Sequence, residues 1–132
     1  MHAPSTSTPR VGDARWGANL AHEAVDRHVV DGHGDREAMR FVDKSGGITS
    51  LTYTELAART DRMAGALRAL GVRPGERVFL LAGRIPELYV AALGALKARA
   101  VVCPLFSAFG PEPIRQRMVL GDAAVLVTTS SL

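Results

Sequence analysis

Apolar residues in the C-terminal half of the chain form short continuous runs. These runs are 78–82, 100–105 and 123–128. Such runs are typical of parallel strands that are covered on both faces. The segments between them, 85–99 and 111–120, each carry a proline where a helix tolerates a missing N–H. The order strand, helix, strand, helix, strand therefore predicts a parallel α/β layer with right-handed connections.

A helix is predicted near the start of the regular pattern. Between residues 19 and 33 the apolar positions recur at intervals of three or four. Asn19 is placed to cap this helix, because its side-chain oxygen can accept from the first unpaired amides. Gly32 and Gly34 are expected to end it. Residues 1–15 carry two prolines and no apolar periodicity, which predicts a mobile tail.

A β-hairpin is predicted after this helix. Two β-like runs, 38–43 and 48–51, lie on either side of the turn Lys44–Gly47. We expect Gly46 and Gly47 to supply the positive φ values that a tight hairpin turn needs. The N-terminal helix and the hairpin together precede the parallel layer.

A Thr-x-x-Glu motif follows the hairpin at Thr52 and Glu55. In a capping box the Thr hydroxyl accepts from the amide of the Glu, whose carboxylate accepts from the amide of the Thr. The motif predicts the start of a helix that Gly71 closes. We expect that helix to bury one stripe of four side chains, Leu56, Met63, Leu67 and Leu70.

The predicted layer is short of helices to cover it. Parallel strands need cover on both faces, and the sequence supplies few helices for three such strands. We therefore expect the first part of a larger α/β sheet rather than a closed one.

Composition narrows the class of protein. The chain has 132 residues, of which 47% are hydrophobic and 22% charged. This balance is typical of a single soluble globular domain. The longest uncharged apolar run, 88–96, is half the ~18 residues that a membrane span needs. The first ten residues contain no apolar stretch, so we expect no secretory signal. A single cysteine, Cys103, fits a reducing cytoplasm.

The basic residues allow two interpretations. The formal net charge is +3, and 14 of the 16 basic residues are arginine. One interpretation is a surface for phosphate or nucleic acid; the other is a compositional bias toward arginine. The arginines form no run and are not interleaved with aromatic residues. We favour the compositional bias and expect no nucleic-acid partner.

Common catalytic and cofactor motifs are absent from the sequence. No Gly-x-Gly-x-x-Gly follows a predicted strand, and no Gly-x4-Gly-Lys-Ser/Thr occurs. The Gly-His-Gly at 32–34 is better interpreted as a helix end than as a dinucleotide loop. His22 and His28 are six residues apart and make a poor chelate, so no metal ligand is assigned. Cys103 is expected to be a buried, inert thiol. We assign no catalytic residue.

One loop does not fit a purely structural explanation. Residues 106–112 join the end of a predicted parallel strand to the start of a helix. Ligands of open α/β sheets bind at that edge. Two aromatic residues, Phe106 and Phe109, could line a slot for a flexible ligand arm. Alternatively, both rings anchor the loop in the core.

Several segments resemble the adenylate-forming enzymes in the order in which that family carries them. LTYTEL at 51–56 resembles the first core motif of the family, and residues 95–118 resemble its second conserved stretch. ANLAHEAVDRHV at 18–29 and the loop FSAFGPE narrow the resemblance to the AMP-forming acetyl-CoA synthetases, or acetate–CoA ligases. The resemblance covers residues 14–129, nearly the whole chain.

The resemblance implies a two-step reaction in the cytoplasm. Acetate and ATP give acetyl-adenylate and pyrophosphate with the help of Mg²⁺, and CoA then captures the acetyl group. The family's phosphate loop, adenine segment, ribose aspartate and catalytic lysine have no counterpart in this sequence. Residues 16–132 therefore resemble an incomplete N-terminal AMP-binding-enzyme subdomain. The implied partner is the remainder of the ligase, on the same or a separate polypeptide, and the chain alone is predicted to be inactive.

The resemblance also suggests a role for the aromatic loop. Phe106, Ser107, Ala108 and Phe109 match the family's Phe-Gly-Gly-Phe-like segment, which borders the tunnel for the CoA pantetheine arm. Ser107 and Ala108 replace two glycines, which keeps the loop small but removes some backbone freedom.

Other functions remain as alternatives. The chain could be a non-catalytic α/β interaction module that binds through its uncovered strand, or one half of a split ligase. Both need the same open edge. A nucleotide-binding dehydrogenase is disfavoured by the missing glycine fingerprint.

Overall fold

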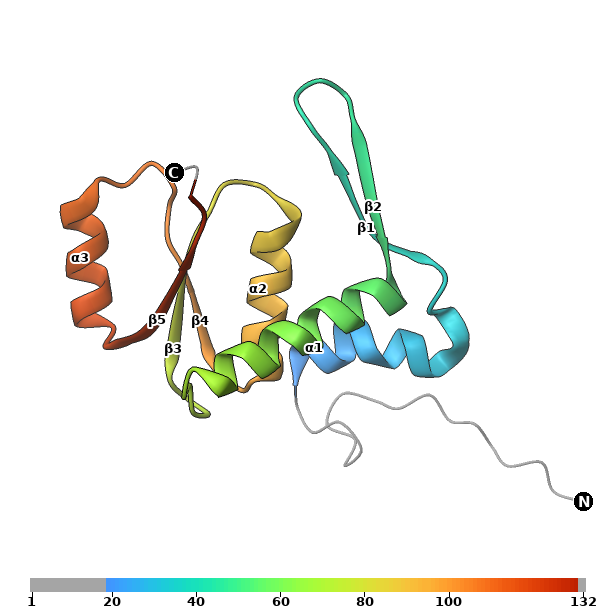
Figure 1. The fold of residues 1–132 in the computed structure, drawn as a ribbon, viewed down its shortest axis with the longest axis horizontal. Helices are drawn as coiled ribbons and strands as arrows, with labels where there is room; N and C mark the ends of the chain where they lie inside the picture. Colours follow the sequence, from blue (N-terminus) through green and yellow to red (C-terminus); the bar gives the residue numbers. More distant parts are fainter. Residues whose placement is uncertain (1–18, 131–132) are drawn as a thin grey trace, which may run out of the picture.

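The computed structural model describes residues 19–130 as an α/β body with a projecting hairpin (Figure 1). The predicted mobile tail at 1–15 lies outside the described residues. Among residues 19–130, none of the helices combines the length and apolar character that crossing a bilayer requires. The elements in chain order are η1 (His22–Asp26), η2 (Val29–His33), β1 (Glu37–Val42), β2 (Ile48–Thr52), α1 (Tyr53–Ala69), β3 (Arg77–Leu81), α2 (Pro86–Lys97), β4 (Val101–Pro104), α3 (Pro111–Leu120) and β5 (Ala123–Thr128).

The predicted N-terminal helix is confirmed, with π-helical turns in η1 and η2 that were not expected. The Asn19 side-chain oxygen accepts from the amides of Ala21 at 3.0 Å and His22 at 3.4 Å, as an N-cap does. Gly32 adopts a φ of 83° at the other end. Local capping signals therefore set both limits of this helix.

The hairpin of β1 and β2 is also confirmed, but its turn works differently from the prediction. Of the two glycines in the turn, only Gly46 has a positive φ, at 86°. The Asp43 carboxylate organises the turn, because its Oδ1 accepts from the amides of Ser45 and Gly47, each at 2.8 Å. A Cβ on Gly47 would lie 2.4 Å from Asp43 Oδ2. Gly47 therefore lies close to this carboxylate, and its φ is not positive.

Helix α1 begins at the predicted capping box. The Glu55 amide donates to the Thr52 hydroxyl at 3.2 Å, and the Thr52 amide donates to the Glu55 carboxylate at 2.8 Å. The prediction for Leu70 is wrong: its side chain is 71% exposed. Leu70 lies just beyond the last helical turn, where Gly71 turns the chain away with a φ of 90°. The residues of α1 that are buried are Leu56, Thr60, Ala64 and Leu67.

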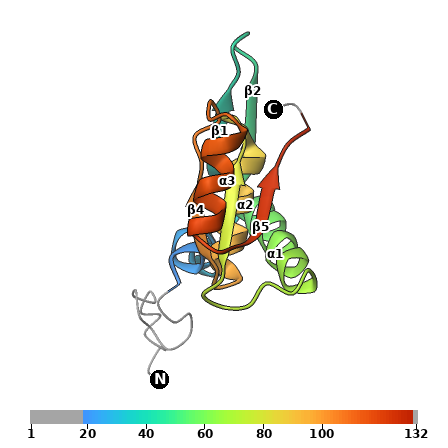
Figure 2. The same cartoon turned by 90° about the vertical axis from the view of Figure 1, so that its left-hand side faces the viewer.

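The parallel sheet has the order β4-β3-β5. The crossover through α2 moves from β3 to one side, and the crossover through α3 moves back past β3 to the other side. Two right-handed crossovers in opposite directions place their helices on opposite faces. Figures 1 and 2 show α2 and α3 on the two sides of the sheet.

The position of each strand in the sheet corrects one expectation. The central strand β3 is buried as predicted, with Val78 fully buried. The runs that form β4 and β5 were expected to be buried on both faces, yet each lies at an edge of the three-stranded sheet and is only partly covered. Val101 in β4, for example, is 47% exposed.

The larger core lies between the sheet and the pair α1 and α2. Val78 and Leu80 of β3 pack there with Ala91 and Ala95 of α2. The two helices approach closely at Gly94, where a Cβ would lie 2.5 Å from the Met63 Cβ. A smaller cluster of Val25, Leu51 and Leu56 joins the N-terminal helix and the hairpin to the body.

A buried lysine connects three helices at this core. The Lys97 side chain is only 2% exposed, and its Nζ donates to Asp26 at 2.6 Å and to Asp61 at 2.7 Å. Asp26 belongs to η1, Asp61 to α1 and Lys97 to α2. Asp26 also contacts the His22 imidazole. The ion pairs therefore hold the N-terminal helix against α1 and α2.

Candidate functional site

The sheet topology singles out one crevice. The crossover through α2 runs from β3 to β4, and the crossover through α3 runs back past β3 to β5, so the winding reverses and the chain has a topological switch point between β3 and β5. Open α/β sheets bind ligands outside the carboxyl ends of their strands at such a point. Two features lie at this edge: a pocket beside α2, and the loop from β4 to α3.

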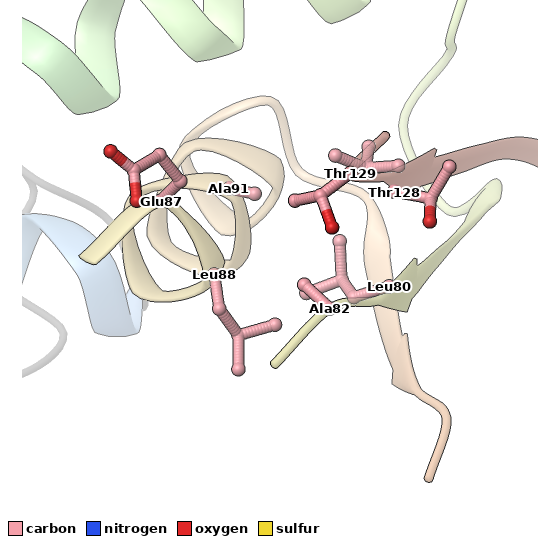
Figure 3. A pocket seen from close by; sticks show the side chains of 8 residues that line it. Leu80, Ala82, Glu87, Leu88, Ala91, Thr128 and Thr129 are labelled. Carbon is pink, nitrogen blue, oxygen red and sulfur yellow. The ribbon is translucent and has the colours of Figure 1, made fainter. Parts of the chain in front are cut away.

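The pocket lies between the first turns of α2 and the ends of β3 and β5 (Figure 3). Its volume is about 50 Å³. That is room for a few water molecules and far less than the several hundred Å³ of a typical cofactor site. The pocket is therefore too small to hold a nucleotide. Its lining residues are Leu80, Ala82, Glu87, Leu88, Ala91, Val127, Thr128 and Thr129.

The aromatic loop forms a tight turn at the same edge of the sheet. The Phe109 amide donates to the Phe106 carbonyl oxygen at 3.0 Å, which places Ser107 and Ala108 at an exposed apex. The two rings meet edge to face with centroids 5.6 Å apart. Phe106 is 65% exposed, so this ring does not anchor the loop in the core. Phe109 is half-buried.

A cation from α3 holds the half-buried ring. The Arg117 guanidinium carbon lies 4.2 Å from the centroid of Phe109, within the range of a cation–π contact. Arg117 also donates from Nη1 to the Pro113 carbonyl oxygen at 3.1 Å. The turn is thus attached to the body through α3.

Two helix N-termini face this edge without side-chain caps. Ile85 precedes α2, Gly110 precedes α3, and neither supplies a capping side chain. At α3 the first turn contains Glu112, whose negative charge complements the helix dipole. Hydrogen bonds from Arg115 and then Gln116 lower the pKa of the Glu112 carboxyl from its ordinary value. This carboxylate is therefore charged at neutral pH.

The histidines considered for metal chemistry lie in the N-terminal helix, and the cysteine considered for thiol chemistry lies in β4. His22 contacts Asp26, and the His28 ring lies against Tyr53 with centroids 4.4 Å apart. Cys103 lies in the edge strand β4 and is half-buried, whereas full burial was predicted. Within residues 19–130 no three His, Cys, Asp or Glu side chains gather in a group that could hold a metal ion.

Comparison with known proteins identifies the family. The sequence pattern of the AMP-binding enzymes matches residues 26–132. The chain belongs to the AMP-binding enzyme family. Acetyl-coenzyme A synthetase from Streptomyces avermitilis is 38% identical over 110 residues, 83% of this chain and 17% of that protein. Acetyl-coenzyme A synthetase from Bacillus subtilis is 36% identical over 115 residues, 86% of this chain and 20% of that protein.

Solved structures of an acyl-CoA synthetase and a CoA ligase have the same fold in this region. An acyl-CoA synthetase from Brucella canis superposes with a TM-score of 0.77 at 34% identity, covering 83% of this chain and 20% of that one. A benzoate CoA ligase from Burkholderia xenovorans superposes with a TM-score of 0.73 at 29% identity, covering 86% of this chain and 22% of that one. The predicted α/β fold and the predicted resemblance are confirmed. The chain spans about a fifth of the length of these relatives.

The sequence analysis missed the roles of one arginine and one lysine, Arg117 and Lys97. Arg117 gives no local signal, because its ring partner Phe109 lies before the helix and the contact depends on how the loop folds back. Lys97 carries a weak signal, since it is one of two lysines in an arginine-rich chain. A lysine at the end of a largely apolar helix could have suggested a buried ion pair.

Proposed function

We propose that this chain is the N-terminal portion of an AMP-forming acetate–CoA ligase. The complete ligase forms acetyl-adenylate from acetate and ATP, and then acetyl-CoA, in the cytoplasm. The observation that carries the proposal is the identity of 36–38% to acetyl-coenzyme A synthetases over 83–86% of this chain. The chain spans 17–20% of those proteins, so the remainder of the ligase is its proposed partner.

The aromatic turn is the proposed contribution of this chain to coenzyme binding. Phe106, Ser107, Ala108 and Phe109 form one wall of the channel for the CoA pantetheine arm. An exposed ring beside a small apex suits a thin, flexible arm, because the ring supplies apolar area and the small residues leave room. CoA supplies the thiol that captures the acetyl group, and these residues orient its arm.

The proposed sites for ATP and Mg²⁺ lie in the remainder of the ligase, and two observations support this placement. The pocket at the switch point is too small for a nucleotide, and residues 19–130 hold no cluster of carboxylates for a metal ion. We therefore assign ATP and Mg²⁺ to the remainder of the ligase and expect the chain alone to be inactive.

The proposal is tested by grafting. The matching segment of the Bacillus subtilis synthetase is replaced by this chain, and acetate-dependent ATP–pyrophosphate exchange and acetyl-CoA formation are measured. We expect both activities in the chimera and neither in the 132-residue chain alone. The negative control is the Bacillus subtilis synthetase from which the matching segment has been removed without replacement. Exchange by the chain alone, or a folded chimera without exchange, would contradict the proposal. Sequencing the coding DNA past the Leu132 codon is the companion measurement.

A second candidate, a non-catalytic interaction module or half of a split ligase, is favoured by the exposed side of the molecule. β5 has no outer neighbour among the described strands, and Val119 and Leu120 of α3 are 67% and 87% exposed. An unpaired edge beside apolar side chains favours association. Mixing the chain with a separately produced downstream polypeptide should then restore exchange. A monomer on gel filtration that binds no apolar dye would count against this candidate.

A further inference from the structure

Arg117 of α3 contacts the aromatic turn without belonging to it. We propose that Arg117 is a positioning residue that holds the 106–109 turn through Phe109, and that it thereby supports coenzyme capture and not adenylate formation. The structural half of the proposal stands on the geometry of this chain. The catalytic half rests on the proposed function, in which the turn lines the coenzyme channel.

The turn has little else to hold it. Among the contacts of residues 19–130, one backbone hydrogen bond closes the turn, from the Phe109 amide to the Phe106 carbonyl at 3.0 Å. Its apex is exposed, and the Phe106 ring rests on Phe109 and not on the core. Phe109 is therefore the residue through which the turn is fixed. Whatever positions its ring positions the apex as well.

The Arg117 guanidinium is placed for this task. It lies 4.2 Å from the Phe109 ring centroid, and its bond to the Pro113 carbonyl fixes the side chain along α3. Its neighbour Arg115 behaves differently, since it donates to both oxygens of Glu112 at 2.7 and 2.9 Å. Two arginines on one helix thus have separate partners, a ring and a carboxylate. Arg115 is the matched control.

Limited proteolysis tests the structural half on the 132-residue chain. Chymotrypsin cleaves after Phe106 when the turn opens, whereas cleavage after the buried Phe79 reports global unfolding. In Arg117→Met, which keeps an apolar stem but lacks the cation, we expect cleavage after Phe106 to be about threefold faster, the factor expected of an exposed cation–π contact. Cleavage after Phe79 should not change. Arg117→Lys should remain close to the wild type, and Arg115→Met should equal it.

Three outcomes would overturn the structural half. The first is equal cleavage after Phe106 in Arg117→Met and the wild type. The second is an equal acceleration after Phe79 in Arg117→Met, which would indicate general destabilisation. The third is a wild-type chain cut no faster after Phe106 than after Phe79, because the turn would then open only when the whole chain unfolds and Arg117 would not control a local opening.

The chimera described above tests the catalytic half. Arg117→Met should raise the KM for CoA about threefold and leave kcat and the acetate-dependent exchange rate unchanged. Arg117→Lys should restore the KM, and Arg115→Met should have no effect. An unchanged KM, or an equal loss in the exchange reaction, would overturn the role in coenzyme capture. If the unmutated chimera shows no exchange, the proposed function fails, while the proteolysis still decides whether Arg117 holds the turn.

Discussion

The two sides of the three-stranded sheet differ in how completely they are covered. On the α2 side, Val78 and Leu80 are at most 2% exposed and pack in one core with residues of both α1 and α2. On the α3 side, no residue of α3 is buried, and Leu120 at its end is 87% exposed. The α2 face of the sheet is covered by a buried core, whereas the helix on the α3 face remains largely exposed.

The cause of this difference is the number of helices behind each face. α1 and α2 pack so closely that a Cβ at Gly94 would lie 2.5 Å from the Met63 Cβ, whereas α3 contains no buried residue. A face with one exposed helix is what we expect where further polypeptide packs. The comparison therefore supports the proposal that this chain is part of a larger ligase, and it can be tested by matched pairs of variants.

The largest difference is expected between two leucines. Leu80→Ala leaves a cavity in the core between the sheet, α1 and α2, and should lower the free energy of unfolding by about 2–5 kcal/mol. Leu120→Ala removes an exposed side chain and should change it by less than ~0.5 kcal/mol. Urea denaturation of the 132-residue chain measures both. Equal effects of the two substitutions would contradict the comparison.

The second comparison is between the buried ion pairs of Lys97 and the exposed ion pair of Arg115. Lys97→Met leaves the largely buried Asp26 carboxylate without its ammonium partner and should cost about 3 kcal/mol. Arg115→Met breaks an exposed pair with Glu112 on α3 and should cost less than ~1 kcal/mol. Asp61→Asn should also cost little, because Asp61 is 65% exposed. A Lys97→Met variant as stable as the wild type would show that the N-terminal helix packs against α1 and α2 without the ion pairs.

Two glycines give a smaller contrast. A Cβ at Gly94 would lie 2.5 Å from the Met63 Cβ, which the packed helices cannot move easily, so Gly94→Ala should cost about 2 kcal/mol. A Cβ at Gly121 would lie 2.5 Å from the outer end of the Phe79 ring. We expect Gly121→Ala to cost less, because α3 can shift away from the sheet. Thermal denaturation compares the two, and a costlier Gly121→Ala would reverse the conclusion.

The smallest expected effect is a difference in pH dependence. Backbone and side-chain hydrogen bonds from Thr52 lower the pKa of Glu55, and the bonds from Arg115 and Gln116 lower that of Glu112, both from an ordinary 4.5. A carboxyl with a lowered pKa in the folded state stabilises it at neutral pH, and this stabilisation is lost as the pH falls below about 4.5.

Glu55→Gln keeps the capping geometry but removes the titration. We expect the unfolding midpoint of this variant to fall less between pH 7 and pH 3.5 than that of the wild type. Glu112→Gln should follow the wild type, because α3 is weakly attached and its stability contributes little to global unfolding. Urea titrations at the two pH values give the comparison. A larger change in Glu112→Gln would mean that α3 unfolds together with the core.

Signals that act within a few residues were predicted well from the sequence. The Asn19 cap, the Thr52 and Glu55 box, and the helix starts at Pro86 and Pro111 all lie where the sequence analysis placed them. The aromatic turn was also located, although its two rings could not be told apart. Phe106 is exposed and Phe109 half-buried because α3 folds back against only one of them.

The amino-acid sequence by itself determined the elements, their order and the family, since caps, turns and apolar runs depend on neighbouring residues. The tertiary structure alone decided which strand lies in the centre of the sheet, which lysine is buried and which arginine meets the turn. These features join residues far apart in the chain, as Lys97 joins Asp26 across 71 positions. Such contacts follow from how the crossovers place whole elements, and they leave no periodic signal in the sequence.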